Sequence, residues 1–172
     1  MERISRRTHI FDGQAALWAG LIGGTVFLLS ELLMVPALGG GSLYGPLRMM
    51  AAIVLGPSVL AADTFNIVVL GAALVVHYFL SLVYALLFAL CVNRLLQPGG
   101  AAIAGLVGGF LLYLVNFFGF TALFPWFVTA RNGITIFNHL VFGLTTVFFY
   151  IAIRRAHHLG TEGHTPLIHR HA

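Results

Sequence analysis

The amino-acid sequence predicts an all-α membrane protein built as a four-transmembrane-helix bundle. Hydrophobic residues make up 59% of the chain and charged residues only 8%, whereas soluble domains carry about 25% charged residues. Four apolar stretches each reach the length of about 20 residues that a helix needs to cross a bilayer. With 172 residues, the chain has room for one transmembrane bundle over residues 1–155, and not for a large soluble domain as well.

The elements follow one another with short connections. The four spans are expected at residues 15–38, 65–92, 101–124 and 134–153. The apolar segment 49–62 is too short to span and is interrupted at Gly56-Pro57, which predicts a re-entrant or interfacial segment. The first span lacks a clear cleavage site, so we expect it to stay in the protein. Residues 156–172 are rich in histidine and predict a flexible cytoplasmic tail.

The arginines indicate the orientation of the bundle. With four spans, one side carries Arg3, Arg6, Arg7, Arg94, Arg154, Arg155 and Arg170. Only Arg48 and Arg131 fall on the other side. The positive-inside rule then places both termini in the cytoplasm. The formal charge of +4 is explained by these span ends, and we expect no nucleic-acid partner.

Two stretches of the chain nearly repeat each other, at residues 19–33 and 104–118. Each has two glycines four residues apart, which allow close packing of helices. Seven positions after the second glycine stands Glu31 in the first copy and Asn116 in the second. The pattern predicts two parallel helix-pair repeats, about residues 15–94 and 101–155, related by an axis along the membrane normal. Chance similarity between apolar sequences is the alternative.

Four polar residues from the four spans are expected at one depth. From the helical rise, Glu31 and Asn116 lie about 24 and 22 Å from the cytoplasmic end of their spans. His77 and His139 lie about 22 and 21 Å from theirs. A charge in hydrocarbon costs about 2.5–3.5 kcal/mol, so such groups face the bundle interior and pair there. This layer predicts an intramembrane polar site. The alternative is that these residues only form hydrogen bonds that hold the helices together.

Two cofactors are compatible with this layer. Glu31, His77 and His139 form a donor set for a divalent metal, with Asn116 as a weaker ligand. Histidines on spans two and four, with glycines on spans one and three, resemble the pattern of membrane cytochromes b, which implies b-type haem. Gly24 and Gly109 lie about 10 Å below the histidine layer by helical rise, which lowers the expectation of haem.

The outer mouth of the bundle is expected to carry Arg48, Asp63, Arg131 and Asn132. The arginines there can attract anions or pair with Glu31 or Asp63. Arginines that anchor the span ends in the interface are the alternative.

Several runs in the second half resemble a group of small four-span bacterial inner-membrane proteins of unknown function. These runs are Asn116-Phe117-Phe118-Gly119-Phe120-Thr121, Phe124-Pro125-Trp126-Phe127, Ala130-Arg131-Asn132 and His139-Leu140-Val141-Phe142-Gly143. The resemblance implies a multi-pass protein of the bacterial inner membrane. Some members carry the label "sodium:proline symporter", but such symporters are far longer and use broken inverted-repeat helices, so no activity is carried over.

Three functions are consistent with the sequence. The polar layer favours proton- or cation-linked transport of a small solute, with the chain acting as a homo-oligomer in the lipid bilayer. Electron transfer through b-type haem is the first alternative. A role as an accessory or assembly subunit of a larger membrane complex is the second. There is no phosphate-binding loop, no Gly-x-Ser-x-Gly motif and no lysine, so an enzyme is not expected.

Overall fold

The computed structural model describes residues 11–61, 64–92 and 98–162. These residues form helices and short connections, with no strand among them. The long helices are α1 (Gly13–Gly39), α3 (Ile67–Val92), α4 (Pro98–Leu114) and α5 (Gly133–Glu162). The shorter ones are α2 (Gly45–Leu55), η1 (Pro57–Leu60), η2 (Val115–Gly119), η3 (Phe120–Ala122) and η4 (Pro125–Ala130).

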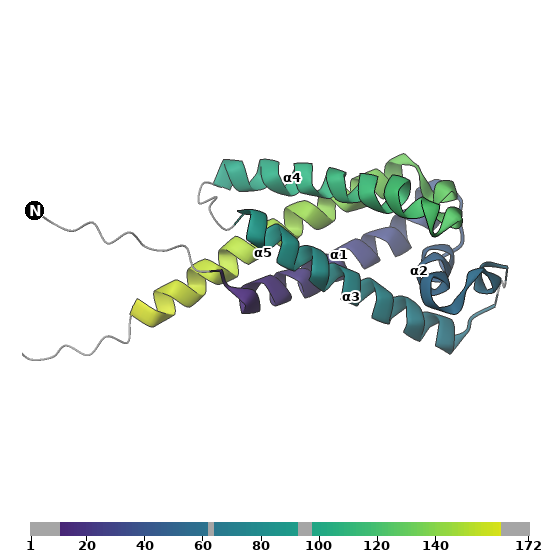
Figure 1. Ribbon diagram of the computed structural model, residues 1–172, viewed down its shortest axis with the longest axis horizontal. Coiled ribbons are helices and arrows are strands. Elements are labelled where there is room, and N and C mark those ends of the chain that lie inside the picture. The colour runs from purple at the N-terminus through teal and green to yellow at the C-terminus, as the bar shows by residue number, and fades with distance from the viewer. Residues whose placement is uncertain (1–10, 62–63, 93–97, 163–172) are drawn as a thin grey trace, which may run out of the picture.

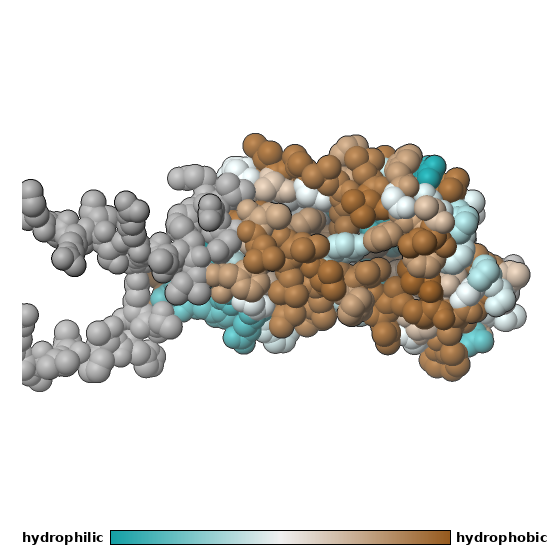
Figure 2. Space-filling view, viewed as in Figure 1, coloured by the Kyte–Doolittle hydropathy of each residue, from teal (hydrophilic) through white to brown (hydrophobic). Residues whose placement is uncertain are grey.

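Four helical segments are long and apolar enough to cross a membrane, as the sequence predicts. They are Gly13–Gly39, Ile67–Val92, Gly99–Ala122 and Gly133–Leu159. Their outward faces are hydrophobic, and Figure 2 shows this surface covering most of one side of the molecule. Large apolar side chains exposed to this extent are typical of lipid contact and not of a soluble monomer.

Two predicted boundaries differ from the structure. The short apolar segment begins at Gly45, before residue 49, because Pro46 suits the first turn of a helix. It ends at Gly56, whose φ of 84° is readily adopted by glycine. The last helix does not stop at 153 but continues to Glu162, so the first residues of the expected tail are helical. Residues 163–172 lie outside the described part of the chain.

The four long helices form an open arrangement and not a closed square. Helix α5 packs along α1 and α4, and α1 also packs along α3. Helix α2 lies against α3, whereas α3 and α4 touch each other at only a few residues. Figure 1 shows α1 starting and α5 ending at one end of the bundle, with α2 at the opposite end. We call these the terminal end and the α2 end.

Small residues close the bundle near its terminal end. Ala15, Ala16 and Ala19 of α1 are fully buried against Ala89 of α3 and Val147 of α5. Alanine at such contacts lets helix backbones approach closely, and dispersion contacts then hold the helices together in lipid. None of these residues lines the cavity found toward the α2 end.

The repeated glycines make equivalent contacts in the two halves. A Cβ atom on Gly20 would lie 3.2 Å from the carbonyl oxygen of Ser81, four residues after His77. A Cβ atom on its counterpart Gly105 would lie 2.9 Å from the carbonyl oxygen of Gly143, four residues after His139. Each glycine helix therefore approaches the histidine helix of its own half one turn after the histidine.

Candidate functional site

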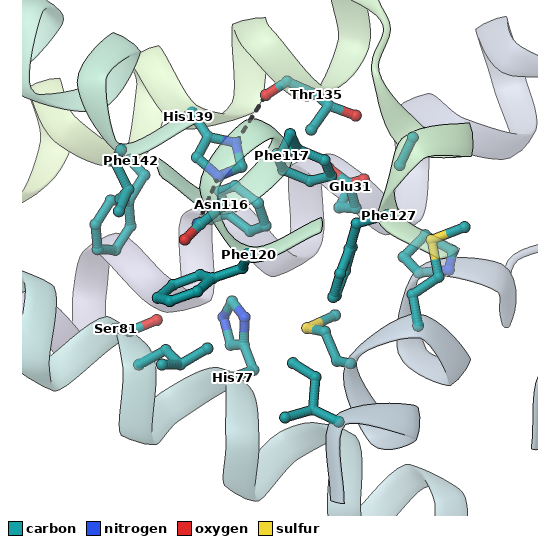
Figure 3. Close-up of a pocket in the computed structure, with 18 of the residues that line it drawn as sticks. Glu31, His77, Ser81, Asn116, Phe117, Phe120, Phe127, Thr135, His139 and Phe142 are labelled. Carbon is teal, nitrogen blue, oxygen red and sulfur yellow. Dashed lines mark hydrogen bonds between the residues drawn. The ribbon is translucent and has the colours of Figure 1, made fainter. Parts of the chain in front are cut away.

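A cavity of about 230 Å³ lies between α3 and α4 toward the α2 end. Helices α1 and α5 supply part of its wall, and α2 closes it toward the α2 end of the bundle. Most of its lining is apolar and aromatic, with a few polar side chains converging on it (Figure 3). The polar lining residues are Glu31, His77, Ser81, Tyr84, Asn116, Thr135 and His139.

All four residues of the predicted polar layer line this cavity. Glu31 comes from α1, His77 from α3 and His139 from α5. Further lining residues accompany the two histidines at the helical spacing of three or four residues, which places side chains on one face of a helix. Ser81 and Tyr84 thus join His77, and Thr135 and Phe142 join His139. The structure therefore brings the four residues of the predicted layer to one cavity.

Asn116 stands on a π-helical turn, Val115–Gly119, at the end of α4. Such turns widen the helix and leave backbone groups in need of other partners. Arg131 supplies one: its Nε atom donates to the Phe117 carbonyl at 2.7 Å, and its NH2 group donates to Thr121 Oγ1 at 3.0 Å. Its guanidinium also lies 4.2 Å from the centre of the Phe118 ring. Arg131 thus holds the turn that presents Asn116 to the cavity.

A chain of hydrogen bonds crosses from α3 to α5 through Asn116. Tyr84 donates to Oδ1 of Asn116 at 2.8 Å. Nδ2 of Asn116 lies 3.2 Å from Nε2 of His139. Nδ1 of His139 lies 2.8 Å from the Thr135 carbonyl, which can only accept. His139 is therefore a neutral imidazole that donates from Nδ1 and accepts at Nε2, with both nitrogens occupied (Figure 3).

Glu31 has a different set of partners. Its Oε2 atom accepts a short hydrogen bond from Nδ2 of Asn138, a residue with no exposed surface. Oδ1 of Asn138 in turn accepts from Ser30 Oγ at 2.6 Å. The Oε1 atom of Glu31 has no hydrogen-bond partner in the described part of the chain, and it is not fully buried. This oxygen is available to the cavity.

His77 also keeps one atom available. Its Nε2 atom lies 2.8 Å from the Gly24 carbonyl oxygen, so Nε2 carries the proton and donates it. The Nδ1 atom is then an acceptor, and no residue that the structure describes donates to it. Ser81 Oγ, one turn away on α3, likewise has no hydrogen bond among these residues. Figure 3 shows His77 reaching from α3 into the space below Asn116 and His139.

The residues expected at the outer mouth do not pair with Glu31. Arg48 is buried on α2 and donates to the Thr64 carbonyl at 3.2 Å. Arg131 holds the π-helical turn, and Asn132 caps α5 by accepting from the Thr135 N–H at 3.1 Å. Neither arginine lines the cavity. Of the pairings considered for these arginines, the one with Glu31 is absent among the described residues, and Asp63 lies outside them.

The predicted metal site does not form either. Among the residues described, no three His, Cys, Asp or Glu side chains lie close enough together to hold a metal ion. Glu31, His77 and His139 line different parts of one cavity, and each imidazole spends at least one nitrogen on a protein partner. Asn116, proposed as a weaker ligand, binds His139 instead.

The two histidines are also poorly arranged to hold haem. Axial ligands need a free imidazole lone pair that points at the iron. His139 has none, because both of its nitrogens are hydrogen-bonded. The ring of Phe27 lies 5.6 Å from the His77 ring centre and 5.1 Å from that of His139. An aromatic side chain in contact with both imidazoles takes up space that a flat macrocycle would need.

No family model matches the chain, and no curated protein or solved structure matches it. The resemblance to small four-span bacterial proteins therefore stays an expectation.

Sequence reasoning missed three parts of the site. Asn138 holds Glu31, and nothing in its position in the sequence points to a partner on α1. The π-helical turn at Asn116 has no clear sequence signal. The separation of α3 and α4 follows from which helix faces pack, and the low hydrophobic asymmetry of apolar spans hides those faces.

Proposed function

We propose that the protein binds a small solute in the cavity between α3 and α4 and moves it across the membrane in a step linked to protons. The observation that carries the proposal is the free Oε1 atom of Glu31 in an intramembrane cavity of about 230 Å³. A carboxylic acid at membrane depth is costly and commonly marks a pathway for ions or protons. The cavity also has the concave, mainly apolar character of small-molecule sites.

Proton linkage would work through competition at Glu31. The carboxyl group either carries a proton or faces the solute as a carboxylate, and its Asn138 partner can donate to it in both states. The titratable groups that share the cavity with it are His77 and Tyr84 from α3 and His139 from α5. Arg48 of α2 and Arg131 lie near the α2 end and outside the lining. No other acidic side chain of the described residues lines the cavity.

Transport would require the bundle to open toward its terminal end as well. The alanine and glycine contacts near that end are closed, whereas the α3–α4 contact is slight. A movement of α2 and α3 together against α4 and α5 would use this slight contact as the line of opening. Because four spans are few for alternating access, we propose a homo-oligomer in the bacterial inner membrane, with both termini in the cytoplasm.

The test is proton movement in proteoliposomes that carry a pH-sensitive dye. Three probes with one aromatic ring but different charges are added. They are the cation phenyltrimethylammonium, the anion benzenesulfonate and neutral benzyl alcohol. We expect at least one of them to drive proton movement that Glu31→Gln abolishes. The matched control is Asp12→Asn, the same carboxyl-to-amide change at the far end of α1, which should keep the movement. No response to any probe would contradict the proposal.

A further inference from the structure

We propose that the solute bound at this site is a small organic ammonium cation, and that it reaches the cavity sideways from the bilayer between α3 and α4. This inference rests on the proposed function and specifies its substrate class. It follows from the charges, the aromatic lining, the size and the position of the cavity.

The available polar atoms of the cavity favour positive charge. Glu31 offers Oε1, and His77 offers the lone pair of Nδ1. His139 is neutral, because it donates to a carbonyl from Nδ1 and accepts at Nε2. No arginine lies in the lining, and the whole chain has no lysine. An anion would meet a carboxylate and lone pairs here, whereas a cation would meet a complementary field.

The aromatic lining supports the same class of ligand. Phe27, Phe117, Phe120, Phe124, Phe127 and Phe142 surround the cavity with Tyr84. Figure 3 shows Phe120 and Phe127 projecting into the space above His77. Aromatic rings attract quaternary and other ammonium ions through their negative faces, and more strongly in a desolvated site. A carboxylate beside an aromatic cage is a recognition pattern for such cations.

The size of the cavity limits the ligand. An engineered cavity of about 150 Å³ binds benzene, and the cavity here holds about 230 Å³. A single aromatic ring with a trimethylammonium group therefore fits, whereas a ligand with several fused rings or a full acyl chain does not fit inside.

The route to the cavity follows from the helix arrangement. Helices α3 and α4 touch at only a few residues, so the wall between them is the thinnest part of the bundle. Phe120, which lines the cavity, still has 40% of its surface exposed. Figure 2 shows a small hydrophilic strip within the hydrophobic face at the level between α4 and α3. A cation with an apolar body concentrates at the membrane interface and can enter there.

Binding then exchanges two cations at one carboxylate. As the ammonium ion enters, the Glu31 carboxyl group loses one proton to solvent and its carboxylate balances the new charge. No covalent bond other than this O–H bond changes. The reverse step restores the proton and releases the ammonium ion.

Equilibrium binding of tritiated phenyltrimethylammonium to the purified full chain in detergent tests the inference. We expect unlabelled phenyltrimethylammonium to compete at least tenfold better than tert-butylbenzene, which has the same shape without the charge. Benzenesulfonate should not compete. Equal competition by tert-butylbenzene, better competition by benzenesulfonate, or no saturable binding would overturn the inference.

A variant of Glu31 tests whether binding depends on the carboxylate charge. Glu31→Gln keeps an oxygen that can accept from Asn138 but removes the charge, and we expect its affinity to fall at least tenfold. Asp12→Asn should bind as the unmodified chain does, and thermal melting of each variant checks its folding. Unchanged affinity in folded Glu31→Gln protein would also overturn the inference.

The outcomes separate this inference from the proposed function. Charge-selective binding without any proton movement in proteoliposomes would support the ligand class and contradict transport. Glu31-dependent proton movement with benzenesulfonate or benzyl alcohol, but not with phenyltrimethylammonium, would support transport and contradict the ligand class.

Discussion

The Nε2 atom of His77 lies 2.8 Å from the carbonyl oxygen of Gly24. This contact requires the two backbones to be close, and a glycine at residue 24 allows it because α1 meets α3 without a side chain between them. It also orients the imidazole. With Nε2 occupied by the carbonyl, Nδ1 is left as the acceptor of a residue that lines the cavity. One glycine on α1 thereby sets the chemistry that α3 presents.

Glycine-to-alanine changes should destabilise the protein where helices pack closely and should be tolerated where the glycine faces open space. A Cβ atom on Gly109 would lie 3.0 Å from the carbonyl carbon of His139, which is backbone and cannot turn away. We expect Gly109→Ala to destabilise the protein by about 1–3 kcal/mol, the usual effect of overpacking. A thermal or denaturant unfolding curve measures it.

Gly71→Ala is the matched control, because a Cβ atom there has nothing within 4 Å. This variant should be unchanged or more stable, since alanine is the better helix former. If the two variants behaved alike, the close approach of α4 to α5 would not matter to stability.

The hydrogen bond from Asn138 to Glu31 should be measurable as a coupling energy. Both side chains are buried, and the bond joins α1 to α5. In a double-mutant cycle of Glu31→Ala and Asn138→Ala, we expect a favourable interaction of about 1 kcal/mol, within the range for polar contacts inside membranes. A cycle of Thr25→Ala and Asn138→Ala, whose side chains bind different partners, should be additive. An additive result in the first cycle would disprove the link.

Arg131 should hold the end of α4. Its bonds to the Phe117 carbonyl and Thr121 Oγ1 are lost in Arg131→Met. We expect amide hydrogen exchange over residues 115–122 to become faster in this variant, with exchange in the middle of α3 unchanged. Uniform change along the chain would mean that Arg131 acts on global stability, and no change would mean that the π-helical turn holds itself.

The two histidines should show opposite tautomers. The hydrogen bonds place the proton on Nε2 of His77 and on Nδ1 of His139. Nitrogen-15 magnetic resonance of the ring atoms in bilayers, assigned by His77→Gln and His139→Gln, distinguishes the tautomers directly. The same tautomer at both positions would contradict the described hydrogen bonds.

Asp12 should make the terminal end sensitive to acid. Burial raises the pKa of Asp12, but hydrogen bonds from the Ala15 N–H and from His157, with the charges of His157 and His158, outweigh it and leave the pKa below its ordinary value. The folded protein therefore binds fewer protons than the unfolded chain. The stabilisation is present above the unfolded pKa of about 4 and is lost as the pH falls through the folded pKa.

The check compares the unmodified chain with Asp12→Asn across that pH range. The stability difference should favour the unmodified chain near neutral pH and shrink in acid. Asp12→Ala should lose about 1 kcal/mol more because it also removes the helix cap. A difference that does not vary with pH would show that the carboxylate has no role.

The sequence predicts the positions of the helices and the depth of their polar residues, but not the hydrogen-bond partners of those residues. The four spans follow from hydropathy, and the common depth of Glu31 and His77 follows from counting along helices of constant rise. Hydrogen-bond partners follow from rotation about the helix axes, which nearly uniform apolar faces do not reveal. Asn138 lies next to His139 in sequence yet serves Glu31 on another helix. Likewise, a carboxylate was one of the partners considered for Arg131, whereas its guanidinium binds the Phe117 carbonyl and Thr121 Oγ1 at a π-helical turn.

The central claim is that the carboxyl group of Glu31 exchanges a proton for a ligand inside the cavity. The most direct measurement is proton release when phenyltrimethylammonium is added to the purified protein in lightly buffered detergent solution. We expect close to one proton to be released per cation bound, and neither release nor tight binding in Glu31→Gln. Saturable binding of the cation with no proton released across the pH range would contradict it.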